Sequence, residues 1–339
     1  MRRFIFQLLS VGVVAFCSAS ALYAQDAKLI EAAKKEGGRV VVYGSLENDT
    51  MDLLSAAFKK KTGIEVDFWR EAANKVMDRA VTEMRAGKPL YDVALTNTPP
   101  MEFMFKEGAL AKYDSPSDRF FPKEVLHPQL GPQYRNSIIG IVYHSGIIKP
   151  SEAPKSLEDL LKPQYRGKVV MPDASQHTTT AQWLASLYKV MGSKEKADKF
   201  IHDLAATKPL LVPSLTPAGE RITTGEAPIG IAFIKNVVFY GKKGVPLDYV
   251  RLGKFMGDGQ VIALGAKPPH ANAGKAFVDF FLGEEGLKIM ADIGEFVTRK
   301  GIYPPLPDAD KIQLVEMVDL DQKGYAEKMA EYKKIFLQQ

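Results

Sequence analysis

Short apolar runs alternate with helix-period segments along the first hundred residues. The runs Val40–Tyr43, Ile64–Trp69 and Tyr91–Leu95 are rich in β-branched and aromatic residues, which is typical of strands. Between them, residues 50–63 and 76–87 repeat apolar side chains at intervals of three and four, the spacing of one helix face. Strands that alternate with helices in this way predict an α/β fold with a mostly parallel sheet flanked by helices.

The pattern changes in the middle of the chain. Residues 114–136 are proline-rich and irregular, and the strand-forming run Ile138–His144 follows them. Further predicted elements are a helix at 156–161, a strand at 168–171, a long helix at 178–191, and strands at 229–233 and 260–264, with a helix at 271–282. A chain of this length is expected to form two domains. We predict lobe 1 at 25–136, lobe 2 at 137–256, a return to lobe 1 at 257–310, and a C-terminal helical tail at 311–339.

The first 24 residues have the layout of a secretory signal peptide. Arg2 and Arg3 precede an apolar run of about fourteen residues, and small residues lead to Ala24. The run is shorter than the roughly twenty residues that cross a bilayer. We therefore expect residues 1–24 to be cleaved and the mature protein to be periplasmic. Cys17, the one cysteine, would leave with them, which excludes a disulfide or a cysteine nucleophile in the mature chain.

Charge and motifs exclude several classes of function. The formal net charge is +5, and loss of Arg2 and Arg3 leaves +3, too small an excess to indicate nucleic-acid binding. The sequence has no Gly-x-Ser-x-Gly, Gly-x-Gly-x-x-Gly or His-Glu-x-x-His motif and no phosphate-binding Gly-rich lysine loop. The five histidines lack metal-ligand spacing. We predict a binding protein that is not an enzyme and needs no cofactor.

Six segments resemble the extracellular solute-binding proteins of ABC importers, family 1 type, and most closely the branch of ferric-iron-binding proteins. They are VVYGSLEND at 41–49, TGIEVDFWR at 62–70, YDVALTNT at 91–98, EAPKSLEDLLKPQYRGKVVMPD at 152–173, TGEAPIGIAF at 224–233 and ALGAKPPHANAGKAFVDFFLGEEGLKIM at 263–290. The resemblance implies a two-lobed type II periplasmic-binding-protein fold, joined by two crossing strands, that closes by a hinge on a ligand between the lobes. It also implies a monomer that delivers this ligand to an ABC permease at the inner membrane. A sensory protein that presents its ligand to a membrane receptor is the alternative.

The same resemblance bears on ferric iron. In that branch a residue after the first strand, a carboxylate after the third and two adjacent tyrosines after a later strand hold the metal. The corresponding positions here are Glu47, Asn97 and residues 235–238, so the carboxylate is an amide and the tyrosine pair is absent. If Fe(III) is the ligand, Glu47 and the nearby Tyr240 must bind it, a thin shell for a trivalent ion.

The other hypothesis is a small anionic or polar ligand that carries a phosphate, phosphonate or carboxylate group. Loops at the carboxyl ends of parallel strands form the ligand crevice of such folds, and a helix start offers N–H donors to an anion. The candidate residues are Ser45, Glu47, Asn97, Thr98, Ser175, His177, Thr178, Thr179, Asn236 and Tyr240. The alternatives are that a threonine only caps the helix and that His177 is a neutral ring bonded to its loop. Arg135 and Lys235 are further cationic candidates, as a carboxylate clamp and an anion partner.

Overall fold

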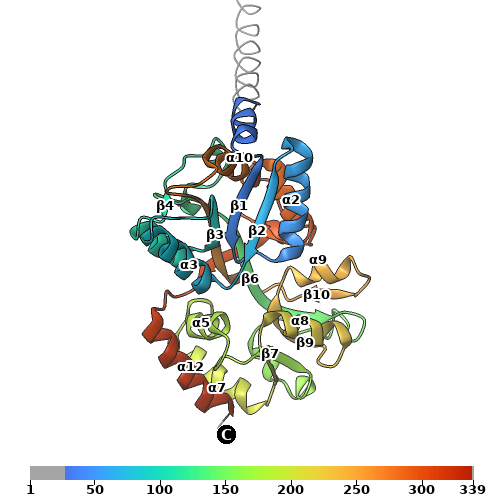
Figure 1. The fold of residues 1–339 in the computed structure, drawn as a ribbon. Helices are drawn as coiled ribbons and strands as arrows, with labels where there is room; N and C mark the ends of the chain where they lie inside the picture. The colour runs from blue at the N-terminus through green and yellow to red at the C-terminus, as the bar shows by residue number, and fades with distance from the viewer. Residues whose placement is uncertain (1–26, 338–339) are drawn as a thin grey trace, which may run out of the picture. The chain divides into compact units, whose positions relative to one another are not determined.

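The computed structural model describes residues 27–337, which divide into two compact units (Figure 1). Unit 1 comprises the chain up to Tyr134, Gln260–Ile289 and Thr298–Lys300. Unit 2 comprises Arg135–Gly259, Met290–Val297 and the chain from Gly301 onward. The predicted signal peptide lies outside the described residues. Both units have an α/β architecture, in agreement with the predicted fold class.

Unit 1 is built on a sheet in the order β2-β1-β3-β11. Strand β1 (Arg39–Gly44) is parallel to β2 (Glu65–Arg70) and to β3 (Val93–Asn97). Strand β11 (Lys254–Gly265) is antiparallel to β3, and the short β4 (Leu110–Ala111) pairs with β11. The inner strands β1 and β3 are apolar on both faces because helices cover both sides of the sheet.

Two pairs of helices cover this sheet. Helices α3 (Ala73–Arg85) and α4 (Thr98–Lys106) pack on the face that carries Tyr43 and Ala94. Helices α2 (Asn48–Thr62) and α10 (Ala271–Phe281) contact each other through an edge-to-face pair of Phe58 and Phe277. Helix 27–35 precedes β1, and α11 (Glu284–Asp292) follows α10.

Unit 2 is built on a second sheet in the order β6-β9-β7-β8. Strand β7 (Val169–Pro172) is parallel to β8 (Leu210–Val212) and β9 (Ile229–Phe233), and β9 is antiparallel to β6 (Gly131–His144). Strands β10 (Leu247–Tyr249) and β12 (Phe296–Val297) also pair with β6, and β13 (Gln313–Glu316) pairs with β11. The short β5 (Leu126–His127) pairs with the first residues of β6, and these paired residues belong to unit 1.

Alternate residues of β6 enter different cores of unit 2. Ile139 and Ile141 pack with residues of α5 (Thr178–Ser186), α7 (Lys194–Ala206) and α12 (Gln322–Leu337). Val142 packs instead with α8 (Leu215–Thr224). Because buried Tyr332 of α12 belongs to the first of these cores, the C-terminal helix is an integral part of unit 2.

Two long strands connect the units. Strand β6 passes from unit 1 to unit 2 after Tyr134, and β11 returns to unit 1 after Gly259. The predicted return to lobe 1 was too long, because the chain enters unit 2 at Met290 and, after a short passage through unit 1, again at Gly301. Pairing of Val297 with Arg135 and a hydrogen bond from Tyr249 Oη to Pro307 O hold these segments in unit 2.

Three sequence predictions differ from the structure within unit 2. The predicted helix at 156–161 is a 3-10 turn at Glu158–Leu161. The long helix predicted at 178–191 is two helices, α5 and α6 (Tyr188–Met191). Ser186 Oγ donates to Gln182 O and accepts from Val318 N, and a serine that bonds back to its own helix favours such a bend. Helices α7 and α8 were not predicted.

Candidate functional site

The loops after β1 and β3 bring polar candidates of unit 1 together. Gly44 pairs with Leu95 in the parallel register, so the residues that follow the two strands are neighbours. Thr96 Oγ1 donates to Asn97 Oδ1 at 3.3 Å, and Ser45 Oγ lies 2.7 Å from Thr96 Oγ1. Ser45 N also donates to Leu95 O at 3.1 Å. Two of the predicted residues, Ser45 and Asn97, are thus joined through buried Thr96.

Close packing of the two strands requires a glycine at this point. A Cβ on Gly44 would lie 2.8 Å from Leu95 side-chain atoms and 2.9 Å from Leu95 O. Atoms at such distances overlap, so any larger residue would push β1 away from β3. Gly44 therefore lets Ser45 approach Thr96.

Glu47 and Thr98 stand at the starts of helices α2 and α4. Glu47 is the N-cap residue of α2, and its carbonyl accepts from Met51 N at 3.0 Å. Arg70 Nε donates to Leu46 O at 3.2 Å, which holds the loop in front of this helix. Thr98 is the first residue of α4 and is partly exposed. Helix α2 directs its amino-terminal N–H groups toward the loop that contains the candidates, whereas Pro99 and Pro100 remove two of these donors from α4.

In unit 2, the loop Asp173–His177 leads from β7 into α5 and is held from within. Asp173 Oδ1 accepts from Ser175 N at 2.8 Å, and Asp173 Oδ2 accepts from Gln176 Nε2 at 2.7 Å. His177 is the N-cap residue, and its Nδ1 accepts from Thr180 N at 3.3 Å. Thr180 Oγ1 lies 2.8 Å from the same nitrogen. Burial lowers the pKa of His177, so the ring is neutral and its role in the structure is that of a helix cap.

Thr178 and Thr179 occupy the first turn of α5 beyond that cap. Thr178 is exposed and Thr179 is partly exposed. Among the described residues, neither their hydroxyl groups nor their N–H groups have a hydrogen-bond partner in the structure. The first turn of α5 thus offers donors at its positive end.

Asn236 and Tyr240 belong to α9 (Asn236–Gly241), which follows β9. Asn236 is buried, and its Nδ2 lies against α8, where a Cβ on Gly219 would be 2.3 Å away. Tyr240 is partly buried, and burial together with the charge of Glu220 raises the pKa of its phenol. No hydrogen bond joins either residue to Ser175–Thr179 within residues 27–337, so these candidates form two groups in unit 2.

A buried ion-pair cluster in unit 2 involves a residue that the sequence analysis missed. Arg135 Nη1 and Lys235 Nζ lie 2.6 and 2.8 Å from the same oxygen, Glu295 Oε1. The side chains of Arg135 and Glu295 are only 1% and 2% exposed. The predicted carboxylate clamp at Arg135 therefore binds a carboxylate of the protein itself. No local pattern marks Glu295, since Lys235 is 60 residues away in the sequence.

Residues 27–337 also bear on metal binding and membrane insertion. No group of three or more His, Cys, Asp or Glu residues in this part of the chain could hold a metal ion. No helix in the same range is long and apolar enough to cross a membrane.

Comparison with known proteins gives the family. A model of the bacterial extracellular solute-binding protein family matches residues 39–294. An uncharacterized protein of Haemophilus influenzae is 26% identical over 308 residues, which cover 86% of this chain and 87% of the relative. An Fe(3+)-binding periplasmic protein of Serratia marcescens is 24% identical, and the match covers 95% of this chain and 97% of the relative.

A solved structure supports the fold. The periplasmic binding protein AfuA of Actinobacillus pleuropneumoniae, with fructose-6-phosphate bound, matches with a TM-score of 0.66. The match has 20% sequence identity and covers 89% of this chain and 97% of that protein. Together with the family match, which spans most of the sequence, this confirms the predicted fold and the predicted solute-binding function. The chain belongs to the bacterial extracellular solute-binding protein family.

Proposed function

We propose that the ligand is a small organic anion with a phosphate, phosphonate or carboxylate group. The observation that carries this proposal is the first turn of α5, where the N–H and hydroxyl groups of Thr178 and Thr179 are available as donors. Ser175 adds a third hydroxyl group on the preceding loop. Donors at the positive end of a helix dipole stabilise negative charge.

Unit 1 supplies a second set of polar groups. Ser45, Thr96 and Asn97 form a hydrogen-bonded row beside the starts of α2 and α4. Hydroxyl and amide groups can bind the oxygen atoms of an organic ligand without adding charge. We propose that each set provides contacts for the ligand. Closure is then favoured because the closed form makes contacts that the open form lacks.

The relatives differ in what their names say they bind. AfuA holds fructose-6-phosphate, a phosphorylated organic anion, and the Serratia relative is named for Fe(3+). Likeness at these identities shows the fold, so the choice between ligands rests on the residues present here.

Ferric iron is the second candidate, because of the Serratia relative. Fe(III) requires several anionic oxygen ligands, and this chain offers Glu47 and Tyr240 as the candidates. One carboxylate and one phenol are fewer anionic oxygen ligands than a trivalent ion requires. The donor set therefore fits an organic anion better than a trivalent metal ion.

The proposal also covers export of the protein, its monomeric state and delivery of the ligand. Cleavage after Ala24 releases the mature protein into the periplasm as a monomer that needs no cofactor and catalyses no reaction. The closed, loaded form then docks on an ABC permease of the inner membrane. The alternative docking partner is a sensory receptor. Neighbouring genes distinguish the two, because a permease and an ATPase indicate import and a sensor kinase indicates signalling.

A ligand screen tests the proposal. Native mass spectrometry of the mature protein from its own periplasm identifies a bound mass, and a thermal-shift series compares phosphorylated compounds, carboxylates and Fe(III). At one hundred times its dissociation constant, a specific ligand stabilises the protein by about 2.7 kcal/mol. Stabilisation by Fe(III) alone, with a visible colour that Tyr240→Phe abolishes, would replace the organic anion with iron.

A pair of threonine variants tests the α5 site. Thr179→Val removes one donor hydroxyl and preserves the shape of the side chain, so we expect about tenfold weaker anion binding. Thr223→Val is the matched control, because Thr223 is likewise partly exposed and donates only to its own helix at Glu220 O. Equal affinities for both variants and the unmodified protein would remove Thr179 from the site.

A further inference from the structure

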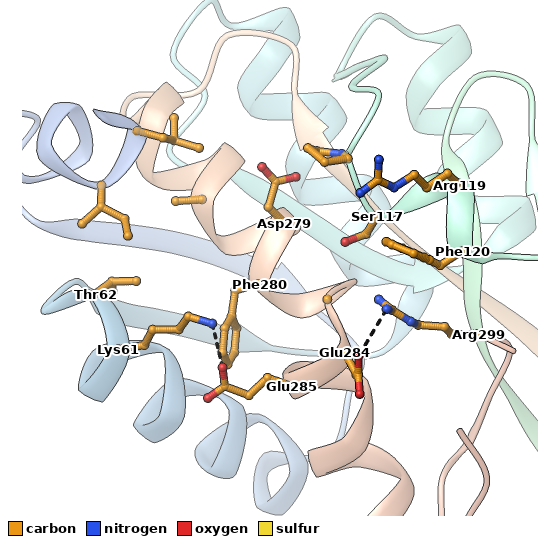
Figure 2. A pocket seen from close by; sticks show the side chains of 15 residues that line it. Lys61, Thr62, Ser117, Arg119, Phe120, Asp279, Phe280, Glu284, Glu285 and Arg299 are labelled. Carbon is orange, nitrogen blue, oxygen red and sulfur yellow. Dashed lines mark hydrogen bonds and ion pairs between the residues drawn. The ribbon is translucent and has the colours of Figure 1, made fainter. Parts of the chain in front are cut away.

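Unit 1 contains a cavity of about 480 Å³ that none of the candidate residues lines (Figure 2). Its walls come from helix 27–35, the end of α2, residues 116–120, α10, the start of α11 and Arg299. The cavity adjoins Lys61 and Thr62 at the end of α2, whereas Ser45 and Glu47 precede the start of this 15-residue helix. At 1.5 Å per residue these ends are about 20 Å apart, so the cavity is separate from the loops assigned to the ligand.

Two arginines and one phenylalanine form the polar end of the cavity. Arg119 and Arg299 lie against the Phe120 ring, with Cζ atoms 4.8 and 4.2 Å from its centroid. Arg299 is 9% exposed, whereas the Phe120 ring is 42% exposed. Burial and the nearby charge of Arg119 lower the pKa of Arg299, so the two guanidinium groups lie within each other's field. An anion between them would relieve this repulsion.

The carboxylates of the cavity wall have other partners. Glu285 binds Lys61 at 2.7 Å, and Asp279 accepts from Tyr113 Oη at 2.8 Å and from Ser115 Oγ at 2.7 Å. Glu284 binds Lys288 and lies 3.7 Å from Arg299, which is long for an ion pair. Within residues 27–337, no carboxylate lies within 4.0 Å of the Arg119 guanidinium. Figure 2 shows Arg119 and Ser117 directed toward the cavity.

Part of the cavity wall is apolar. Its residues are Leu29, Ile30, Ala276 and Phe280. The side chains of Leu29 and Ile30 are only partly buried, so the cavity gives them an incomplete apolar environment. An apolar chain inserted here would bury this surface, which contributes roughly 25 cal/mol per Å². The volume is within the range of small-molecule sites.

From these features we infer that unit 1 has a second ligand site, which binds a small organic carboxylate with an apolar stem. The carboxylate binds Arg119 and Arg299 beside the Phe120 ring, and the stem lies against Leu29, Ile30 and Phe280. Ser117 supplies a neutral donor next to the guanidinium groups. This site does not depend on the identity of the ligand transported by the protein.

Octanoate is the probe for this inference. Octanol and octylammonium have apolar chains of the same length, with a neutral and a positively charged head group. Methyl-labelled Ile30 and Leu29 in the mature protein report occupancy of the cavity by NMR. We expect octanoate to shift both methyl signals at a lower concentration than octanol, and octylammonium to bind more weakly than either. Methyl signals that stay unchanged with octanoate, or that respond equally to all three probes, would overturn the inference.

Charge variants locate the carboxylate. Arg119→Gln should weaken octanoate binding about tenfold and leave octanol binding unchanged, because only the charged head contacts the guanidinium group. The control is Arg166→Gln, which removes the same charge from an exposed position in unit 2 and should leave both affinities unchanged. Arg119 is itself exposed, so its replacement should not unfold unit 1. Equal octanoate affinity for Arg119→Gln and Arg166→Gln would remove Arg119 from the site.

Discussion

At the scale of single residues, burial can give a side chain a role that differs from the one expected from the sequence. Arg135 and Lys235 are cations near predicted ligand loops, and from sequence they suit an external anion. In the structure both contact buried Glu295. A buried carboxylate without its cations would carry a large desolvation cost, so this cluster stabilises unit 2 only as a whole.

Neutralising Glu295 tests the cluster. Glu295→Gln should lower the free energy of unfolding by about 3 to 5 kcal/mol, because it leaves a buried arginine without its counter-ion. The exposed pair of Arg221 and Glu226 gives the control Glu226→Gln, which should cost less than about 1 kcal/mol. Urea denaturation followed by Trp183 fluorescence, in a Trp69→Phe background, reports on the core of unit 2. Similar costs for the two variants would contradict the assigned role.

Asp118 gives a prediction about pH. Its Oδ1 is buried and has no hydrogen-bond partner in the described part of the chain, and burial raises the pKa of Asp118 to about 6. The folded state therefore holds this proton more tightly than the unfolded state, whose carboxyl has a pKa of 3.8. The resulting stabilisation is complete below about pH 4 and is lost as the pH rises through 6.

Asp118→Asn removes that dependence. We expect the variant to be more stable than the unmodified protein at pH 7.5, by at most about 2 kcal/mol because solvent screens a partly exposed group. The advantage should vanish at pH 4. Urea denaturation at the two pH values measures it, and a variant that is less stable at pH 7.5 would show that the charged carboxylate has a favourable partner.

At the scale of elements, helix starts after strands carry most of the proposed ligand chemistry. Helices α2 and α4 follow β1 and β3 in unit 1, and α5 and α9 follow β7 and β9 in unit 2. The N-cap of α5 is His177, an unusual residue at this position, and burial keeps its ring neutral. Protonation would place a positive charge at the positive end of the helix.

Replacing His177 tests the cap. His177→Ala should cost about 1 kcal/mol at pH 8, whereas His177→Asn should keep a capping side chain. Because the folded state lowers the pKa of His177, its contribution is present above about pH 6.5 and is lost as the pH falls below that value. The unfolding free energies of the unmodified protein and His177→Ala should therefore differ at pH 8 and converge at pH 5. A difference that persists at pH 5 would show that the ring caps α5 in its charged form as well.

Sequence periodicity located most elements of unit 1, because its strands and helices have strong and regular apolar patterns. The strands β1, β2 and β3 and the helices α2, α3 and α10 lie near their predicted positions. Periodicity did not locate the break between α5 and α6, which depends on a hydrogen bond from the distant Val318 to Ser186. Periodicity also did not predict side-chain contacts, because the hydrogen bonds among Ser45, Thr96 and Asn97 depend on strand register.

At the scale of the whole molecule, the order of segments along the chain matters more than any single motif. The chain passes between the units five times, including passages through β6 and β11. The short passages after Ile289 could not be predicted from sequence, because they depend on pairing of β12 with the distant β6. Each unit nevertheless contains its own set of polar loops at strand ends, which is the arrangement that a two-lobed binding protein needs.

Hydrogen-deuterium exchange with and without the ligand identified by mass spectrometry is the most direct test of the central claim. That claim is that the strand-end loops of each unit contain ligand-binding residues. We expect protection in residues 44–49 and 96–98 of unit 1 together with residues 173–180 of unit 2. Protection confined to one unit, or located away from these loops, would contradict the account.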